Sequence, residues 1–181
     1  MRMVIRNSIL RQAFSGWLGL SALALAAAAV PNNLKVPDGQ MVLLKAVGQG
    51  VQIYACGAKA GDPNQFEWVF KAPEADLEGD TGEKIGRHYA GPTWEANDGS
   101  KVVGEVLERA DAPRPGAVPW LLLKAKSNQG DGTFKSVTYI QRVNTEGGSA
   151  PKEGCDARHG GAEVRVNYKA TYYFYAPTSV R

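Results

Sequence analysis

The stretch Val164-Arg-Val-Asn-Tyr-Lys-Ala-Thr-Tyr-Tyr-Phe-Tyr175 has the composition and the periodicity of a long β-strand. β-Branched and aromatic residues dominate it, and side chains at every second position fall on the same face. One face carries Tyr168, Ala170, Tyr172 and Phe174, and the other carries Lys169, Thr171, Tyr173 and Tyr175. We expect a central strand whose aromatic side chains form the sheet core and its rim. The alternative is that they form a stacking platform for a ligand.

Shorter stretches with the same signals precede this one. The segments between them contain the glycine, asparagine and aspartate residues that are typical of turns. The chain has 21 glycines and 10 prolines, which disfavour long helices, and the only helical turn that we expect lies around Pro73–Gly79. The predicted strands are Val42–Val47, Val51–Cys56, Phe66–Phe70, Thr93–Ala96, Lys101–Leu107, Trp120–Lys126 and Phe134–Val143.

Eight or nine strands joined by short turns predict an all-β fold, either an antiparallel β-sandwich or a flattened barrel. The strongest local signal is Asp98-Gly99, a tight-turn dipeptide between Thr93–Ala96 and Ser100–Leu107. It is expected to close a hairpin in which Gly99 has a positive φ. We find no repeat and no linker, and therefore expect one domain.

Residues 1–29 have the order of a secretory signal peptide. Met1–Gln12 is basic, Ala13–Val30 has no charge, and Ala26–Ala29 is a run of small residues. The alternative is an uncleaved membrane anchor, because Ala13–Val30 reaches the lower limit for a helical span. We expect cleavage, which leaves residues 30–181 as a single β domain with no membrane span, in the periplasm or outside the cell.

The net charge of +3 comes entirely from this N-terminal segment. Arg2, Arg6 and Arg11 lie in it, and it has no acidic residue. Without these three arginines, 18 basic residues face 18 acidic ones, and the basic residues are scattered along the chain. The sequence therefore does not favour a nucleic acid as partner.

Two cysteines, Cys56 and Cys155, lie in the predicted exported part. A single pair in an oxidising compartment usually forms a disulfide, and we expect one here. The alternatives are two buried thiols or, less favoured, a catalytic thiol at Cys155 near His159, since proximity in sequence does not make a Cys–His pair.

Several segments together resemble a family of secreted bacterial and fungal proteins that is catalogued only as a domain of unknown function. The resemblance covers nearly the whole predicted exported part and implies export and one compact domain. It implies no activity, cofactor or catalytic residue. The segments are Val36-Pro-Asp-Gly-Gln40, Val51-Gln-Ile-Tyr-Ala-Cys56, Gly86-Arg-His-Tyr-Ala-Gly-Pro-Thr-Trp-Glu-Ala-Asn-Asp-Gly-Ser100, Pro119-Trp-Leu-Leu-Leu123, Gln141-Arg-Val-Asn-Thr145, Gly147-Gly148 and Gly154-Cys-Asp156.

Some members of that family carry a malate dehydrogenase label, which the sequence does not support. A dinucleotide site needs a G-x-G-x-x-G motif that opens a helix after a strand. The nearest candidate is Gly48-Gln49-Gly50, where Ile53 occupies the third glycine position and a strand pattern follows. We expect no cofactor.

The segment from His88 to Asp98 is the candidate ligand site. Tyr89 and Trp94 could form an aromatic platform, with His88, Glu95 and Asn97 as polar contacts. The alternative is that Trp94 is a core residue, since strand alternation sends Trp94 and Glu95 to opposite faces.

The sequence contains no metal-binding motif, because His88 and His159 have neither H-x-H nor H-E-x-x-H spacing. A composite site could combine His88, Glu95 or Asp98 with His159 or Asp156 from far along the chain.

The function that we expect is that of a secreted or periplasmic, non-catalytic β-sandwich protein with a binding, envelope or structural role. Its partner would be a small molecule, a glycan or an envelope protein. The alternative is a small extracellular hydrolase or carbohydrate-active enzyme that uses His88 and Glu95. An enzyme would need these side chains to converge in a concave pocket.

The signal peptide yields the first testable prediction. The exported protein is expected to lack about 29 residues, because the small-residue run that ends at Ala29 fits a signal-peptidase site. Intact-mass analysis of protein recovered from the periplasm or the medium measures this directly. A full-length mass would instead indicate an anchor.

Overall fold

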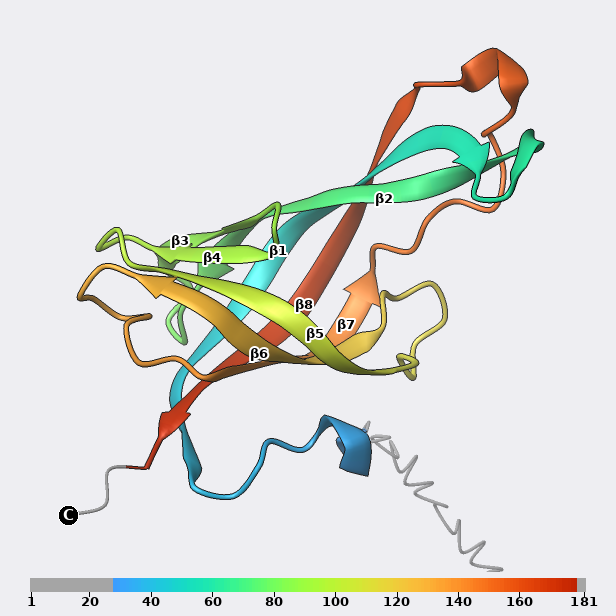
Figure 1. Ribbon diagram of the computed structural model, residues 1–181. Coiled ribbons are helices and arrows are strands. Elements are labelled where there is room, and N and C mark those ends of the chain that lie inside the picture. The colour runs from blue at the N-terminus through green and yellow to red at the C-terminus, as the bar shows by residue number, and fades with distance from the viewer. Residues whose placement is uncertain (1–27, 179–181) are drawn as a thin grey trace, which may run out of the picture.

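The computed structural model describes residues 28–178, so the predicted signal peptide lies almost wholly outside the described residues (Figure 1). The described chain is nearly all β-structure, as predicted, with two short 3-10 helices, η1 (Asn32–Leu34) and η2 (Ala157–His159). The strands are β1 (Gln40–Lys59), β2 (Asp62–Glu78), β3 (Lys84–Tyr89), β4 (Thr93–Ala96), β5 (Lys101–Ala110), β6 (Trp120–Gln129), β7 (Tyr139–Gly147) and β8 (Glu163–Pro177).

Each strand pairs antiparallel with the next one along the chain, and β8 pairs with β1, so that the sheet closes into a barrel. Of the two architectures that the sequence allowed, the barrel is the one observed. Its turns alternate between two ends, with β1–β2, β3–β4, β5–β6 and β7–β8 meeting at one end and β2–β3, β4–β5 and β6–β7 at the other.

Strand β8 has the central position that its sequence predicts, because it pairs with β7 on one side and β1 on the other. The predicted core face is confirmed, since all four of its side chains are at most 3% exposed and belong to the main core cluster: Tyr168, Ala170, Tyr172 and Phe174.

Strand β1 corrects one expectation, because Gly48-Gln49-Gly50 does not interrupt it. The glycines make room for neighbours instead of forming a turn. A Cβ atom at Gly48 would clash with the ring of Tyr172, and one at Gly50 would clash with the backbone of β2.

Two further expectations about local structure are wrong. The segment Pro73–Gly79 is not a helical turn, because Pro73–Glu78 is the end of β2, where Ala75 and Leu77 are buried and Glu74 and Asp76 are exposed. That alternation has period two and places the apolar side chains in the core. Lys84–Tyr89 forms β3, a strand that the sequence analysis did not identify.

One end of the barrel is filled by the β6–β7 connection. Phe134 and Val137 belong to the core cluster and are almost fully buried, so residues 134–138, which the sequence assigned to a strand, instead form a plug. Asp98 ties this plug to the β4–β5 turn. Its carboxylate accepts hydrogen bonds from the backbone amides and hydroxyls of Ser100 and Thr133, at 2.6–2.8 Å.

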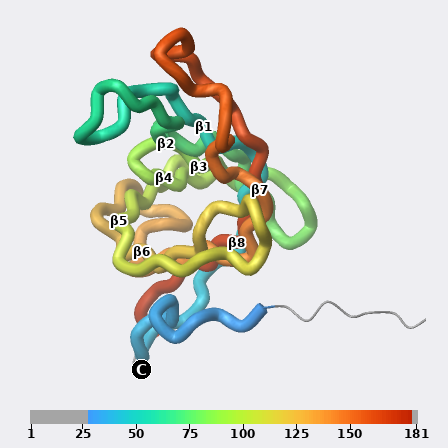
Figure 2. The backbone as a smooth tube through the Cα atoms, turned by 90° about the vertical axis from the view of Figure 1, so that its right-hand side faces the viewer, coloured from blue at the N-terminus to red at the C-terminus, as the bar shows by residue number. Residues whose placement is uncertain are grey.

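The segment that follows the predicted signal peptide packs on the outside of the barrel, beneath β6, β7 and β8 (Figures 1 and 2). Leu34 is fully buried there in a second apolar cluster with Trp120, Leu122 and Val143, and Val30 packs against that cluster. The side-chain amide of Gln141 donates a hydrogen bond of 2.7 Å to the Leu34 carbonyl. This segment is therefore part of the folded domain.

At the end opposite the plug, the β1–β2 hairpin and the start of β8 extend beyond the rest of the barrel (Figure 1). The predicted disulfide is confirmed here, because Cys56 of β1 is bonded to Cys155 in the β7–β8 connection, with 5.3 Å between the Cα atoms. In the loop-entropy model, a crosslink over 99 residues contributes roughly 4–5 kcal/mol. Trp68 of β2 donates to the Glu153 carbonyl at 2.9 Å and supports the same junction.

The Asp98-Gly99 hairpin is also confirmed, since the dipeptide joins β4 to β5 and Gly99 has φ 83°. A Gly99→Val variant is expected to lose about 1–2 kcal/mol of unfolding free energy, because a side chain is strained in this backbone conformation. No heavy atom lies within 4 Å of the added Cβ, so the loss would come from the backbone alone.

The matched control is Gly57→Val. Gly57 lies within β1, and its added Cβ meets only a Val69 methyl at 3.7 Å. Urea denaturation should show the control at or above wild-type stability. Equal stability of the two variants would contradict the assignment of strain to the turn.

Candidate functional site

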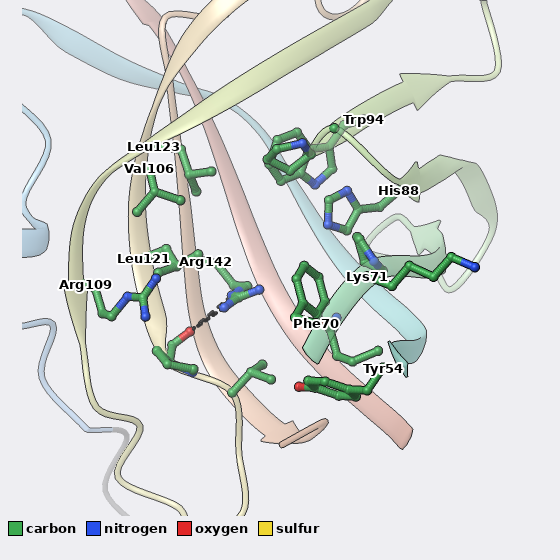
Figure 3. Close-up of a pocket in the computed structure, with 16 residues that line it drawn as sticks. Tyr54, Phe70, Lys71, His88, Trp94, Val106, Arg109, Leu121, Leu123 and Arg142 are labelled. Carbon is green, nitrogen blue, oxygen red and sulfur yellow. Dashed lines mark hydrogen bonds between the residues drawn. The ribbon is translucent and has the colours of Figure 1, made fainter. Parts of the chain in front are cut away.

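The barrel is hollow at the end opposite the plug. A cavity of about 450 Å³ lies among β1, β2 and β3 on one side and β5, β6 and β7 on the other (Figure 3). The β3–β4 turn contributes Gly91 and Pro92, and the β5–β6 connection contributes Val118 and Pro119. Phe70 and Val106 line the cavity and are 52% and 43% exposed, so the cavity opens to solvent at this end.

Apolar side chains form most of the cavity wall. They come from strands far apart in the sequence, because a barrel brings alternate residues of all its strands to one interior. The principal contributors are Tyr54, Phe70, Trp94, Val106, Leu121 and Leu123. Figure 3 shows Leu121, Leu123 and Val106 opposite Phe70 and Tyr54, with open space between them.

His88 is part of this wall and is 2% exposed. Its ring stacks on Trp94 with 4.4 Å between centroids, and Tyr172 meets both rings edge-on. Burial lowers the pKa of His88 to about 3, so the imidazole is neutral at physiological pH. Its Nδ1 lies 2.8 Å from the Thr93 carbonyl, which can only accept a hydrogen bond. The proton is therefore on Nδ1, and Nε2 is left as an acceptor.

Two buried donors on the cavity wall have no hydrogen-bond partner in the described part of the chain. They are Nε2 of Gln52 and Nε1 of Trp94, whose side chains are 2% and 1% exposed. A buried donor without a partner costs roughly 1–3 kcal/mol, and native proteins contain few of them. Both residues line the cavity, but the two nitrogens themselves are almost fully buried.

Three cationic residues line the cavity, Lys71, Arg109 and Arg142, and of these the Lys71 amine points away from it (Figure 3). Lys71 forms an ion pair with Glu163 outside the cavity. Nε and Nη2 of Arg142 donate to the Pro119 carbonyl at 3.1 and 2.8 Å. Neither arginine forms an ion pair within residues 28–178.

The outer face of β3 and β4 carries a separate polar network around Glu95. Its carboxylate accepts hydrogen bonds from the Tyr89 hydroxyl at 2.7 Å and from Arg87 at 3.0 and 3.1 Å, and Lys101 lies 3.6 Å away. The Tyr89 hydroxyl and the Arg87 guanidinium hold the pKa of Glu95 below its ordinary value. Asn97, at the following turn, donates to the Lys84 carbonyl at 2.6 Å.

The candidate site is therefore divided between two faces of the sheet. His88 and Trp94 point into the barrel, whereas Tyr89 and Glu95 belong to the outer network and Asn97 to the turn. His88 and Glu95 do not converge, so they cannot flank one substrate bond as the hydrolase alternative requires. Trp94 is a buried core residue, which was the alternative that the sequence offered, and it also lines the cavity.

The residues of the composite metal site that the sequence analysis considered also do not converge at one place. His159 contacts Asp156 at 2.8 Å on the η2 segment, and neither residue lines the cavity. Asp98 is occupied by its four hydrogen bonds to Ser100 and Thr133, which hold its pKa well below the usual range. Among the described residues, no group of three or more His, Cys, Asp and Glu side chains could hold a metal ion.

The sequence analysis did not identify Gln52, Phe70, Arg109 and Arg142 as site residues. A signal was present for Gln52, because it is polar and shares a strand face with Tyr54, and the structure shows that this face points inward. Arg142 offered a weaker signal, as a charged residue between strand-forming neighbours. Neither could be linked to His88 without knowledge of how the barrel closes.

These features define a class of protein: a closed, antiparallel, eight-stranded meander barrel with one plugged end and a ligand-sized cavity at the other. A family model described as "Protein of unknown function (DUF3455)" matches residues 37–176. The chain therefore belongs to this family, which confirms the resemblance seen in the sequence. No curated protein and no solved structure matches the chain.

Within residues 28–178, the structure contains no helix of the length and apolar character needed to cross a membrane.

The buried His88 yields a prediction about pH. As the pH falls from about 6.5 toward 3, the unfolded chain binds a proton that the folded chain excludes from His88. The free energy of unfolding should therefore fall by up to about 1.4 kcal/mol per pH unit from this group. Urea denaturation at several pH values across this range measures the slope.

The comparison variant is His88→Phe, which retains a ring against Trp94 and removes the titrating group. Its slope should be smaller than that of the wild type. Glu95, Asp98 and Asp156 also have lowered pKa values and weaken the fold in acid, but they are common to both proteins and cancel in the difference. Identical slopes would mean that His88 does not stay neutral in the folded state.

Proposed function

We propose that this protein is an exported, non-catalytic binding protein that holds one small, largely apolar molecule in the barrel cavity. The observation that carries the proposal is a barrel filled at one end and hollow at the other. Eight-stranded barrels are either filled by their own side chains or wide enough to hold one small ligand. This barrel combines the two arrangements along its axis.

The size and the lining of the cavity support a small molecule. Its volume of about 450 Å³ lies in the range of small-molecule sites, roughly 300–1,000 Å³. Such sites are mostly apolar with a few polar groups that fix orientation. Here the polar groups are Gln52, His88 and Arg142, set among aromatic and aliphatic side chains.

Of the partners that the sequence left open, the small molecule fits this site best. An envelope protein would need an exposed surface patch, whereas His88 and Trp94 lie inside the barrel. A glycan would need a wall richer in hydrogen-bonding groups than this one.

Export is supported by three separate features. The N-terminal 29 residues have the pattern of a signal peptide, and the Cys56–Cys155 disulfide fits an oxidising compartment. In addition, the packed structure begins near the predicted cleavage site, since Val30 already contacts the outer apolar cluster. We place the protein in the periplasm or outside the cell.

Binding of the neutral fluorescent probe N-phenyl-1-naphthylamine tests this proposal. The probe is apolar and fluoresces strongly only out of water. Titration with excitation beyond the tryptophan absorption band should show saturable binding with one site per chain. A Val106→Trp variant should bind at least about tenfold more weakly, because the added indole occupies the cavity mouth.

The matched control is Leu107→Trp. Leu107 is the next residue on β5, is 47% exposed, and does not line the cavity. It adds the same side chain to the same strand, and binding should remain at the wild-type level. If the probe does not bind, or if both variants bind like the wild type, the cavity is not the ligand site.

A further inference from the structure

We propose that the ligand is an organic carboxylate whose anionic group binds the free edge of the Arg142 guanidinium and whose apolar body packs against the cavity wall. This inference rests on the proposed function, because it names the chemical class of the molecule in the same cavity. Four features of the site lead to it.

The first feature is the geometry of Arg142. Nε and Nη2 both donate to the single carbonyl oxygen of Pro119, so the side edge of the guanidinium is occupied and its orientation is fixed. Within the described residues, Arg142 makes no other hydrogen bond of normal geometry, and its guanidinium favours the ionised form of the nearby Tyr172 hydroxyl. Two parallel N–H donors on one edge match the two oxygens of a carboxylate.

The second feature is the position of that guanidinium. Arg142 lies on β7 beside Tyr172 of β8, and its side chain projects into the cavity between Leu121 and Phe70 (Figure 3). Arg142 as a whole is only partly exposed to solvent. A cation that is partly removed from water without a carboxylate partner favours binding of an anion.

The third feature is the charge of the lining. The described residues that line the cavity include Lys71, Arg109 and Arg142 but no aspartate or glutamate. Lys71 is paired with Glu163, which does not line the cavity. Within residues 28–178, the lining charges without an ion-pair partner, those of Arg109 and Arg142, are both positive, so an anion entering the mouth is attracted and a cation is repelled.

The fourth feature is the pair of unpartnered donors, Nε2 of Gln52 and Nε1 of Trp94. Both are buried on the cavity wall, and both can be satisfied only by an acceptor. The two nitrogens themselves are almost fully buried, so a ligand reaches them only after a side-chain shift. An acceptor such as a carboxylate oxygen would then satisfy them, and an ammonium would not. The same wall supplies Trp94, Leu121 and Leu123 for the apolar body.

A matched pair of ligands tests the inference. 2-Naphthoate and 2-naphthamide have the same ring system and nearly the same shape, and they differ in charge. Calorimetric titration of the wild-type protein at neutral pH should give 2-naphthoate at least about tenfold tighter binding than 2-naphthamide, as expected for one charge-assisted bidentate contact. Inorganic phosphate should not compete, because it has no apolar body.

Variants locate the anion contact. Arg142→Gln should abolish the preference for 2-naphthoate over 2-naphthamide. Arg142→Lys should keep part of the preference, since the charge remains but the paired donors do not. Arg165→Gln is the control with the same change of charge, because Arg165 pairs with Glu74 and does not line the cavity.

The outcomes separate this inference from the proposed function. If N-phenyl-1-naphthylamine binds but the wild type binds 2-naphthoate no better than 2-naphthamide, the carboxylate assignment is overturned and the binding function stands. The same holds if phosphate displaces 2-naphthoate, or if Arg142→Gln keeps the preference. If none of the three aromatic compounds binds, both proposals fail. The wild-type comparison needs no variant and so does not depend on how Arg142→Gln folds.

Discussion

Closure of the sheet through the β1–β8 pairing is the constraint on which the rest of the structure depends. Once eight strands form a ring, the interior has a fixed width and must be filled or left hollow. Large aromatic side chains fill part of the barrel interior, and they fit because glycines lie opposite them. Gly48 lies against the ring of Tyr172, and a Cβ atom at Gly104 would come within 3.0 Å of the Trp94 ring. Beyond this packed region the wall recedes, and the cavity begins at His88 and Trp94.

The sequence was informative wherever structure depends on neighbours along the chain. Alternation in β8 predicted both its position and its buried face, and Asp98-Gly99 predicted a hairpin with a positive φ. The sequence was uninformative wherever a contact between residues far apart in the chain determines the local structure. Gly48 and Gly50 resemble a turn until the approach of Tyr172 and β2 explains them. Phe134 is as apolar as a strand residue, but it lies in the β6–β7 connection and fills one end of the barrel.

The same limit applies to the candidate site. The sequence identified a segment dense in ligand-binding residue types, and the rule of alternation correctly separated Trp94 from Glu95. It could not show that β3 and β4 place His88 on the inner face beside Trp94, since β3 itself was not identified. Arg142 lies 54 positions beyond His88 in the chain, and only closure of the barrel brings the two to one cavity. A site of this kind is a property of topology more than of any single motif.

The Asp98 carboxylate has a consequence for how the molecule moves. It binds the β4–β5 turn and the β6–β7 plug together, so that one barrel end is crosslinked by four hydrogen bonds. The opposite end depends on the Cys56–Cys155 bridge and on turns that surround an open mouth. Local opening at the mouth does not require these four hydrogen bonds to break, so amide hydrogen exchange should be faster near Gly91 than near Phe134. The proposed ligand would then need only local opening at the mouth, and no global unfolding, to enter or leave.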